Sequence, residues 1–152
     1  LSFIPNFTPT ISLIVFISIM FRNHYILAFI VVLSQIISDY FLGYYSSMLF
    51  VYLSYVLIAI TSKCILKELN FVRAIGTSFI SVLIFYLVSN YGVWQMMDLY
   101  QYNLNGLMQC YLAGIPFLKY SLISTLLYST TIYILFRVTL SKYSDTERVL
   151  YK

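Results

Sequence analysis

The sequence predicts an all-α fold, a polytopic membrane helical bundle, for three reasons. Hydrophobic residues make up 61% of the 152 residues and charged residues only 9%, whereas a soluble domain carries about a quarter charged residues. The mean hydropathy is +0.87. The apolar residues also form runs that short charged breaks separate. We therefore expect the chain to be embedded in a lipid bilayer, and the bilayer to be one of its partners.

Five apolar runs are predicted to cross the bilayer, because each is bounded by charged or turn residues. They comprise residues 10–21, 25–38, 47–61, 71–89 and 120–140. The last has the length that crosses a hydrocarbon core, about 20 residues. We expect residues 1–140 to form a single transmembrane helical-bundle domain. Residues 141–152 would then form a polar cytoplasmic C-terminal tail.

Residues 89–117 differ from the rest of the chain, because Asn, Gln, Asp, Tyr and Trp gather there beside Gly and Pro. Residues 104–118, all but the last of which belong to this stretch, form a sixth apolar segment. The distribution of positive charge can decide whether that segment spans, because Lys and Arg concentrate in cytoplasmic loops. With six crossings the nine basic residues divide almost evenly between the two sides. That pattern shows no bias.

With five crossings, one side holds eight of the nine basic residues and only Lys119 lies on the other. Such a bias is typical of membrane proteins. Residues 104–118 are therefore predicted to be a re-entrant or interfacial segment on the external side. The cytoplasmic side then carries Arg22, Lys63, Lys67, Arg73, Arg137, Lys142, Arg148 and Lys152.

The polar stretch has two main interpretations. Irregular polar backbone is tolerated at membrane depth only where protein or a wet cavity contacts it, which favours the wall or lid of a cavity. Alternatively, Tyr91, Trp94, Tyr100 and Tyr102 form an aromatic belt at headgroup level. A contact with a partner is a third interpretation.

No catalytic or metal-binding motif is visible, and the only histidine, His24, lies in a basic turn. Cys64 and Cys110 are too few for a disulfide scaffold or a zinc site. No cluster of basic residues with interleaved aromatics indicates nucleic acid. We expect a protein that is not an enzyme and that uses no cofactor or metal.

Two further places could contribute to a ligand site. Asp39 is either a helix end exposed to headgroups or a polar anchor at the mouth of an external cavity. Asn6 and Phe7 lie between two prolines; this segment can cap the following helix and can also present both side chains to a ligand. In residues 71–89, Ala74/Ser78 and Thr77/Ser81 have the small-xxx-small spacing of closely packed membrane helices.

Several motifs together resemble a known family. They are "IPNFTPT" before the first apolar run, "SDYFLG" at the end of the second, "SNYGVW" after the fourth and "YLAGIPFLKYSL" before the last. The chain resembles an uncharacterised bacterial membrane protein family, which is similar to the substrate-binding (S) component of energy-coupling-factor (ECF) transporters. The resemblance covers most of the chain, and the motifs occur in the expected order.

The resemblance implies a bundle that binds a small vitamin-like ligand near its external face, under the loops after the first and before the last helix. It also indicates a departure, because this chain starts where the family's first helix should have ended. The residues expected to contact the ligand combine stacking rings with hydrogen-bonding groups. They are Asn6, Phe7, Asp39, Asn90, Trp94 and Tyr111.

The sequence thus favours a small-molecule-binding component of a transporter. The alternative is a non-catalytic structural or accessory subunit of a larger membrane complex that keeps the fold without transport. Other membrane subunits are expected partners in both cases, and nucleic acid in neither. The location would be a bacterial inner membrane, or an organellar inner membrane if an organelle encodes the chain. An ion channel would need more ionisable residues within the spans.

Overall fold

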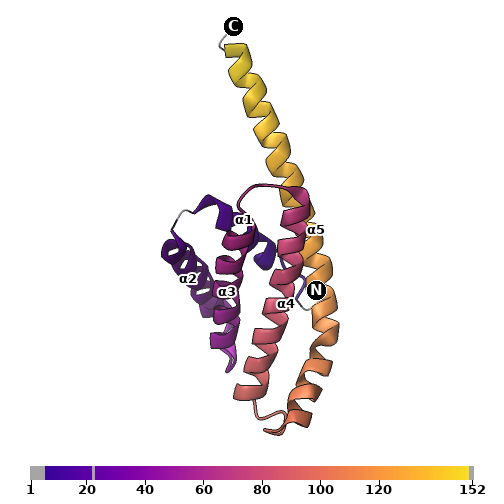
Figure 1. Cartoon of the computed structure of the whole chain (residues 1–152). Helices are drawn as coiled ribbons and strands as arrows, with labels where there is room; N and C mark the ends of the chain where they lie inside the picture. Colours follow the sequence, from indigo (N-terminus) through magenta and orange to yellow (C-terminus); the bar gives the residue numbers. More distant parts are fainter. Residues whose placement is uncertain (1–5, 22, 151–152) are drawn as a thin grey trace.

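The computed structural model describes residues 6–21 and 23–150, except for the side chains of His24 and of residues 140–150. These residues form helices and connecting loops, without any strand (Figure 1), so the predicted all-α class is confirmed. The helices are α1 (Thr10–Met20), α2 (His24–Leu42), α3 (Met48–Ile65), α4 (Phe71–Met96) and α5 (Leu104–Leu150).

Four of these helices, α2 to α5, are long and apolar enough to cross a membrane. The first predicted span forms α1, which has only 11 residues. At 1.5 Å per residue α1 is about 16 Å long, roughly half of a hydrocarbon core. The protein is therefore an integral membrane helical bundle in which α1 fills part of the depth.

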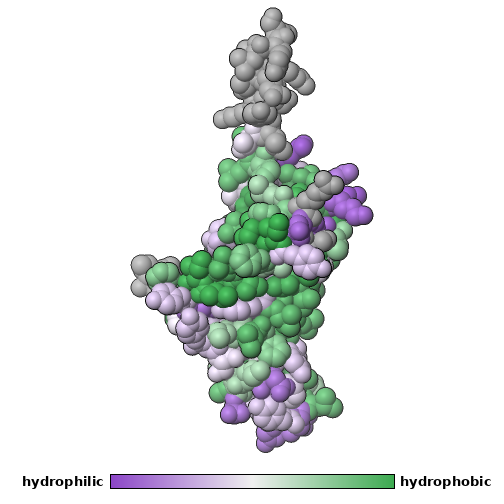
Figure 2. All heavy atoms as spheres, turned by 90° about the vertical axis from the view of Figure 1, so that its left-hand side faces the viewer, coloured by the Kyte–Doolittle hydropathy of each residue, from purple (hydrophilic) through white to green (hydrophobic). Residues whose placement is uncertain are grey.

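The two ends of the bundle differ in charge. One end, called the basic end, holds the end of α1, the α3–α4 loop and the outer part of α5 (Figure 1), with Lys63, Lys67, Arg73 and Arg137. The opposite end, called the hairpin end, holds residues 97–103 between α4 and α5, and the α2–α3 loop. Figure 2 shows an apolar band across the bundle and hydrophilic residues gathered below it.

Residues 104–118 do not fold back as predicted. They begin α5, which continues without interruption to Leu150 although Pro116 lies inside it. These fifteen residues advance about 22 Å along one axis. A continuous helix satisfies its backbone polar groups internally, which a re-entrant loop cannot do without a cavity or protein around it. The re-entrant prediction is therefore wrong, although the segment does start from the hairpin end.

The α4 helix is also longer than predicted, because it continues past Ser89 to Met96. Its last turns pair with the first turns of α5 in a helical hairpin that protrudes beyond α2 and α3 (Figure 1). Asn and Gln side chains there can contact water, so they do not end the helix. At the other end, residues 141–150 continue α5 beyond the bundle.

The core lies where α1 packs between α3, α4 and α5. Val15, Ile58 and Val82 are fully buried in it. Buried hydroxyls join the helices: Ser129 Oγ lies 2.7 Å from Ser78 Oγ and donates to Ser12 Oγ at 3.1 Å. The predicted small face of α4 is confirmed as a packing face, because its members are at most 1% exposed, namely Ala74, Thr77, Ser78 and Ser81.

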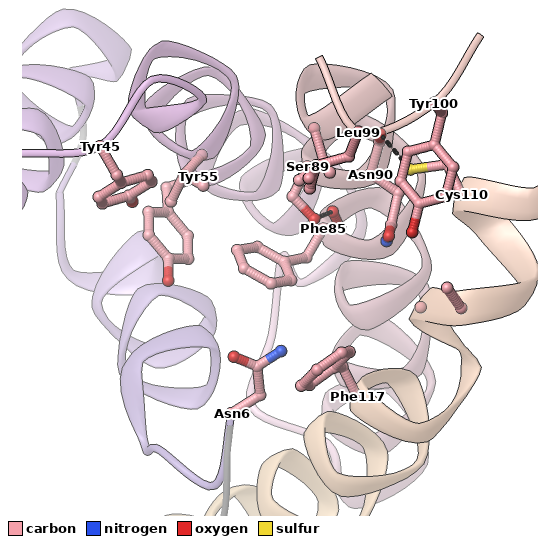
Figure 3. A pocket seen from close by; sticks show the side chains of 14 residues that line it. Asn6, Tyr45, Tyr55, Phe85, Ser89, Asn90, Leu99, Tyr100, Cys110 and Phe117 are labelled. Atoms are coloured by element: carbon pink, nitrogen blue, oxygen red, sulfur yellow. Dashed lines mark hydrogen bonds between the residues drawn. The ribbon is translucent and has the colours of Figure 1, made fainter. Parts of the chain in front are cut away.

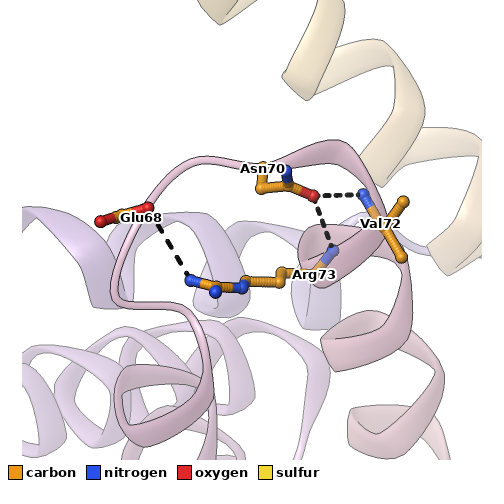
Figure 4. A network of polar contacts seen from close by, with 4 residues as sticks. All are labelled: Glu68, Asn70, Val72 and Arg73. Atoms are coloured by element: carbon orange, nitrogen blue, oxygen red, sulfur yellow. Dashed lines mark hydrogen bonds and ion pairs between the residues drawn. The ribbon is translucent and has the colours of Figure 1, made fainter.

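The start of α4 shows how the basic end is built (Figure 4). Asn70 caps the helix, because its side-chain oxygen accepts hydrogen bonds from the backbone N–H groups of Val72 at 2.9 Å and Arg73 at 3.3 Å. Arg73 also lies 3.9 Å from Glu68, and both side chains are more than half exposed. An exposed ion pair of this kind adds little stability. The cap therefore defines the helix start more than the ion pair does.

Candidate ligand-binding pocket

A pocket of about 520 Å³ opens between α3, α4 and α5 toward the hairpin end. This volume lies within the range of small-molecule sites, about 300–1,000 Å³. Figure 3 shows the side chains that surround it. Its lining residues include Asn6, Tyr45, Tyr55, Phe85, Ser89, Asn90, Tyr100, Cys110, Gly114 and Phe117.

The pocket exists because α1 is short. α1 occupies the space between α3, α4 and α5 only from Thr10 onward, so the hairpin half of that space stays open. The segment before α1 places Asn6 at the pocket, with its carboxamide pointing inward (Figure 3). Asn6 has a φ of 58°, in the left-handed region that Asn tolerates better than most residues.

Two narrow recesses lie next to the pocket, on the side of α1. Their volumes are about 20 Å³ and about 30 Å³, and Asn6 and Phe85 line both recesses as well as the main pocket. The second recess also reaches Thr125 and Ile11. The site therefore consists of a wide outer part and a polar inner end at the start of α1.

One wall depends on close contact between α4 and α5. The Asn90 Nδ2 group donates to the carbonyl oxygen of Tyr86 at 2.8 Å, and Cys110 Sγ donates to the carbonyl oxygen of Asn90 at 3.3 Å. The Asn90 carboxamide lies so close to Gly114 that a Cβ atom at position 114 would overlap it. The lack of a side chain at Gly114 thus lets the amide lie flat against α5.

Aromatic rings form the other walls. Tyr55 and Phe85 stack with their centroids 5.3 Å apart and an interplanar angle of 23°, and Tyr100 and Phe117 face them across the pocket (Figure 3). In the α2–α3 loop, burial and the charge of Asp39 raise the pKa of Tyr45 above its ordinary value. Tyr45 is therefore neutral at physiological pH.

Of the six residues predicted to contact a ligand, Asn6 and Asn90 line this pocket. Asp39 does not line it and is not an exposed helix end either. Its side chain is 7% exposed, and Tyr52 Oη donates a hydrogen bond to Asp39 Oδ2 at 2.6 Å. This partly buried bond joins α2 to α3.

The other three predicted residues lie outside the pocket lining. Trp94 Nε1 donates to the carbonyl oxygen of Gln101 at 3.0 Å, which ties α4 to the loop that precedes α5. Tyr111 Oη donates to the carbonyl oxygen of Leu87 at 2.8 Å. Phe7 packs against Tyr128, with ring centroids 6.0 Å apart. These side chains hold the hairpin and the N-terminal segment in place.

Several lining residues lie in apolar runs that gave no sequence signal of a site. Tyr55 and Phe85 are examples, because an aromatic residue in an apolar run fits core, lipid and pocket equally well. A signal that could have found them is the helical spacing of four, which places Ser89 beside Phe85 and Gly114 beside Cys110. The pocket lining contains no Lys, Arg, Asp or Glu among the described residues.

The comparisons with known proteins extend this description only to the family level. No curated protein and no solved structure matches the chain. Residues 1–147 match one protein family, described as "Family of unknown function (DUF6580)". The match covers nearly all of the chain, which confirms the expectation of an uncharacterised family. The chain, an integral membrane helical bundle, therefore belongs to the family of unknown function DUF6580.

Proposed function

We propose that this protein binds a small, flat molecule from the hairpin end of the bundle, as the substrate-binding component of a membrane transporter. The observation that carries the proposal is the pocket of about 520 Å³ with aromatic walls and uncharged polar groups. Mostly apolar pockets with a few placed polar groups are typical of small-molecule sites.

The pocket walls suit a planar ligand. Tyr55, Phe85 and Phe117 offer ring faces or edges, against which an aromatic ligand stacks favourably. Asn6 and Asn90 supply both hydrogen-bond donors and acceptors, which would define the ligand's orientation. The absence of charged groups from the described lining favours a ligand with little net charge in its body.

The resemblance to S components of ECF transporters supports the same location. Those proteins bind their ligand near the external face, and the charge distribution of this chain assigns the hairpin end to the external side. In this proposal the α4–α5 hairpin is a wall of the site and not a mobile lid. Hydrogen bonds of Trp94 and Tyr111 join the two arms and the loop of the hairpin.

Thermal unfolding of the purified protein in nanodiscs tests the proposal. We expect at least one compound from a panel of planar, vitamin-like molecules to raise the unfolding temperature. The variant Ser89→Trp places a large ring in the pocket and should abolish that rise. Thr131→Trp places the same ring at an exposed position of α5 and should retain it. No response to any compound, or a full response in the Ser89 variant, would contradict the proposal.

A second function, the structural subunit of a larger membrane complex, is favoured by one observation. Figure 1 shows α5 continuing past the basic end, where no other described helix of this chain lies beside it. A helix that projects in this way is available to a partner. If the protein always purifies with several other chains and responds to no ligand, this second function replaces the first.

A further inference from the structure

The inner end of the pocket contains a buried hydroxyl without a partner. Thr125 is 1% exposed, and its Oγ1 atom makes no hydrogen bond within the part of the chain that the structure describes. A buried polar group left unpaired costs about 1–3 kcal/mol, so such groups are rare and need an explanation. Thr125 lines the recess of about 30 Å³, which shares Asn6, Tyr55 and Phe85 with the main pocket.

The same recess meets the first turn of α1. Ile11 belongs to its wall, and α1 begins at Thr10 after Pro9, which makes no side-chain cap bond to the helix. The first N–H groups of a helix have no partner within the helix, and they carry a partial positive charge. Such a helix start attracts hydrogen-bond acceptors, and anions most strongly.

Further donors surround this point. Ser121 and Thr8, which carry hydroxyl groups, line the recess, and Tyr55 and Asn6 line both the recess and the main pocket. Figure 3 shows the Tyr55 ring and the Asn6 carboxamide directed into the same space. Among the described residues, four that line the recess carry hydroxyl groups and none is acidic or basic. Together with the free N–H groups at the start of α1, hydroxyl donors suit an acceptor better than a cation.

From this arrangement we infer that the recess binds the carboxylate of a ligand whose planar body occupies the main pocket. The inference rests on the proposed function and specifies the ligand class: a flat acid with its carboxylate directed at Thr125 and the start of α1. A space of about 30 Å³ holds a group of a few heavy atoms. The carboxylate oxygens accept hydrogen bonds from the Thr125 hydroxyl and the α1 backbone.

The test compares three ligands with one ring system and different end groups. They are 2-naphthoate, 2-naphthamide and 2-naphthylmethylammonium, measured by saturation-transfer NMR on the protein in neutral-lipid nanodiscs, with empty nanodiscs as background. We expect naphthoate to bind best, naphthamide less well and the ammonium compound least. Thr125→Val keeps the side-chain shape without the hydroxyl and should weaken naphthoate binding about tenfold.

The structure offers a matched control. Thr77 is also 1% exposed with an unpaired Oγ1 among the described residues, but it lies outside the pocket and its recesses. Thr77→Val should therefore leave naphthoate binding unchanged. Neither variant should unfold at a lower temperature, because each replaces an unpaired buried hydroxyl by a methyl group.

The outcomes separate the two proposals. Equal naphthoate binding by wild type and Thr125→Val, or a preference for the ammonium compound, would overturn the carboxylate recess and leave the pocket as a ligand site. Binding by none of the three compounds, with the vitamin-like panel also inactive, would overturn the recess together with the proposed function. Weakening by Thr77→Val as large as by Thr125→Val would also count against the recess.

Discussion

At Gly114 a hydrogen atom takes the place where any other residue would put a carbon, and the Asn90 carboxamide lies against it. We predict that Gly114→Ala displaces this carboxamide, breaks its bond to the Tyr86 carbonyl and lowers stability by about 1 kcal/mol. Thermal unfolding in nanodiscs measures the change. Gly76→Ala is the control, because a Cβ atom there meets nothing within 4 Å.

The Gly76 variant should be neutral or more stable, by up to about 1 kcal/mol, since Ala is the better helix former. In an Asn90→Ala background, Gly114→Ala should lower stability only slightly, because the added Cβ atom no longer overlaps the Asn90 carboxamide. An equal loss of stability in both backgrounds would show that the backbone of α5, not the Asn90 side chain, limits position 114.

At the residue scale the sequence predicted polar lining better than apolar lining. Asn6 and Asn90 were predictable because an amide in an apolar setting needs a hydrogen-bond partner. Tyr55 and Phe85 were not predictable as pocket residues, because tyrosine and phenylalanine are equally compatible with a position that faces lipid. Trp94 was assigned to stacking on a ligand, but the nearby loop carbonyl of Gln101 accepts its N–H group.

At the scale of elements, the α4–α5 hairpin shows why the sequence predicted a loop where the structure has helices. Polar residues in an apolar chain indicate contact with water, and here they do lie at the hairpin end (Figure 2). Contact with water, however, does not require irregular backbone. Helices that extend beyond the apolar band also contact water. Asn103 caps the start of α5, because its side-chain oxygen accepts a hydrogen bond from the Gly106 N–H group at 2.8 Å.

The hairpin loop should open at alkaline pH. Tyr102 Oη donates to Asp98 Oδ1 at 3.2 Å, and this hydrogen bond raises the pKa of Tyr102 above its ordinary value of 10.0. A raised folded-state pKa means that the stabilisation is complete below the ordinary value. It is lost as the pH rises through the raised one.

Trp94, the only tryptophan, reports this change, because its ring centroid lies 5.8 Å from that of Tyr102. Its fluorescence should change with a midpoint above pH 10.0, the ordinary pKa of tyrosine. Asp98→Asn should move the midpoint down toward that value, and Tyr102→Phe should remove the transition. If Asp98→Asn leaves the midpoint in place, the carboxylate does not hold the loop.

At the scale of the whole molecule, the charge pattern predicted that basic residues gather at one end, and the structure agrees with this although the pattern misjudged one segment. The described basic side chains of the α3–α4 loop and of α5 beyond Tyr133 share the basic end. The segment 104–118 was misread because a count of charged residues in each loop gives no information about the lengths of the helices. It cannot distinguish a segment that dips into the bilayer from one that stands above it.

Native Cys64 tests which way the molecule faces. It is exposed near the end of α3 at the basic end, whereas Cys110 is buried. Because basic residues favour the cytoplasm, a membrane-impermeant maleimide should label Cys64 in inverted vesicles and not in intact cells. Asn103→Cys in a Cys64→Ser background should show the reverse. Labelling of both positions from the same side would refute this topology.

The unbroken course of α5 links two distant regions mechanically. Gly114 and Phe117 belong to the pocket wall, and the same helix emerges at the far end of the molecule. A helix is stiff over such a length, and its weakest point is Pro116, where the ring removes one hydrogen bond. A tilt of α5 at the pocket would therefore displace the opposite end of the helix, and the displacement would grow with distance along the helix axis.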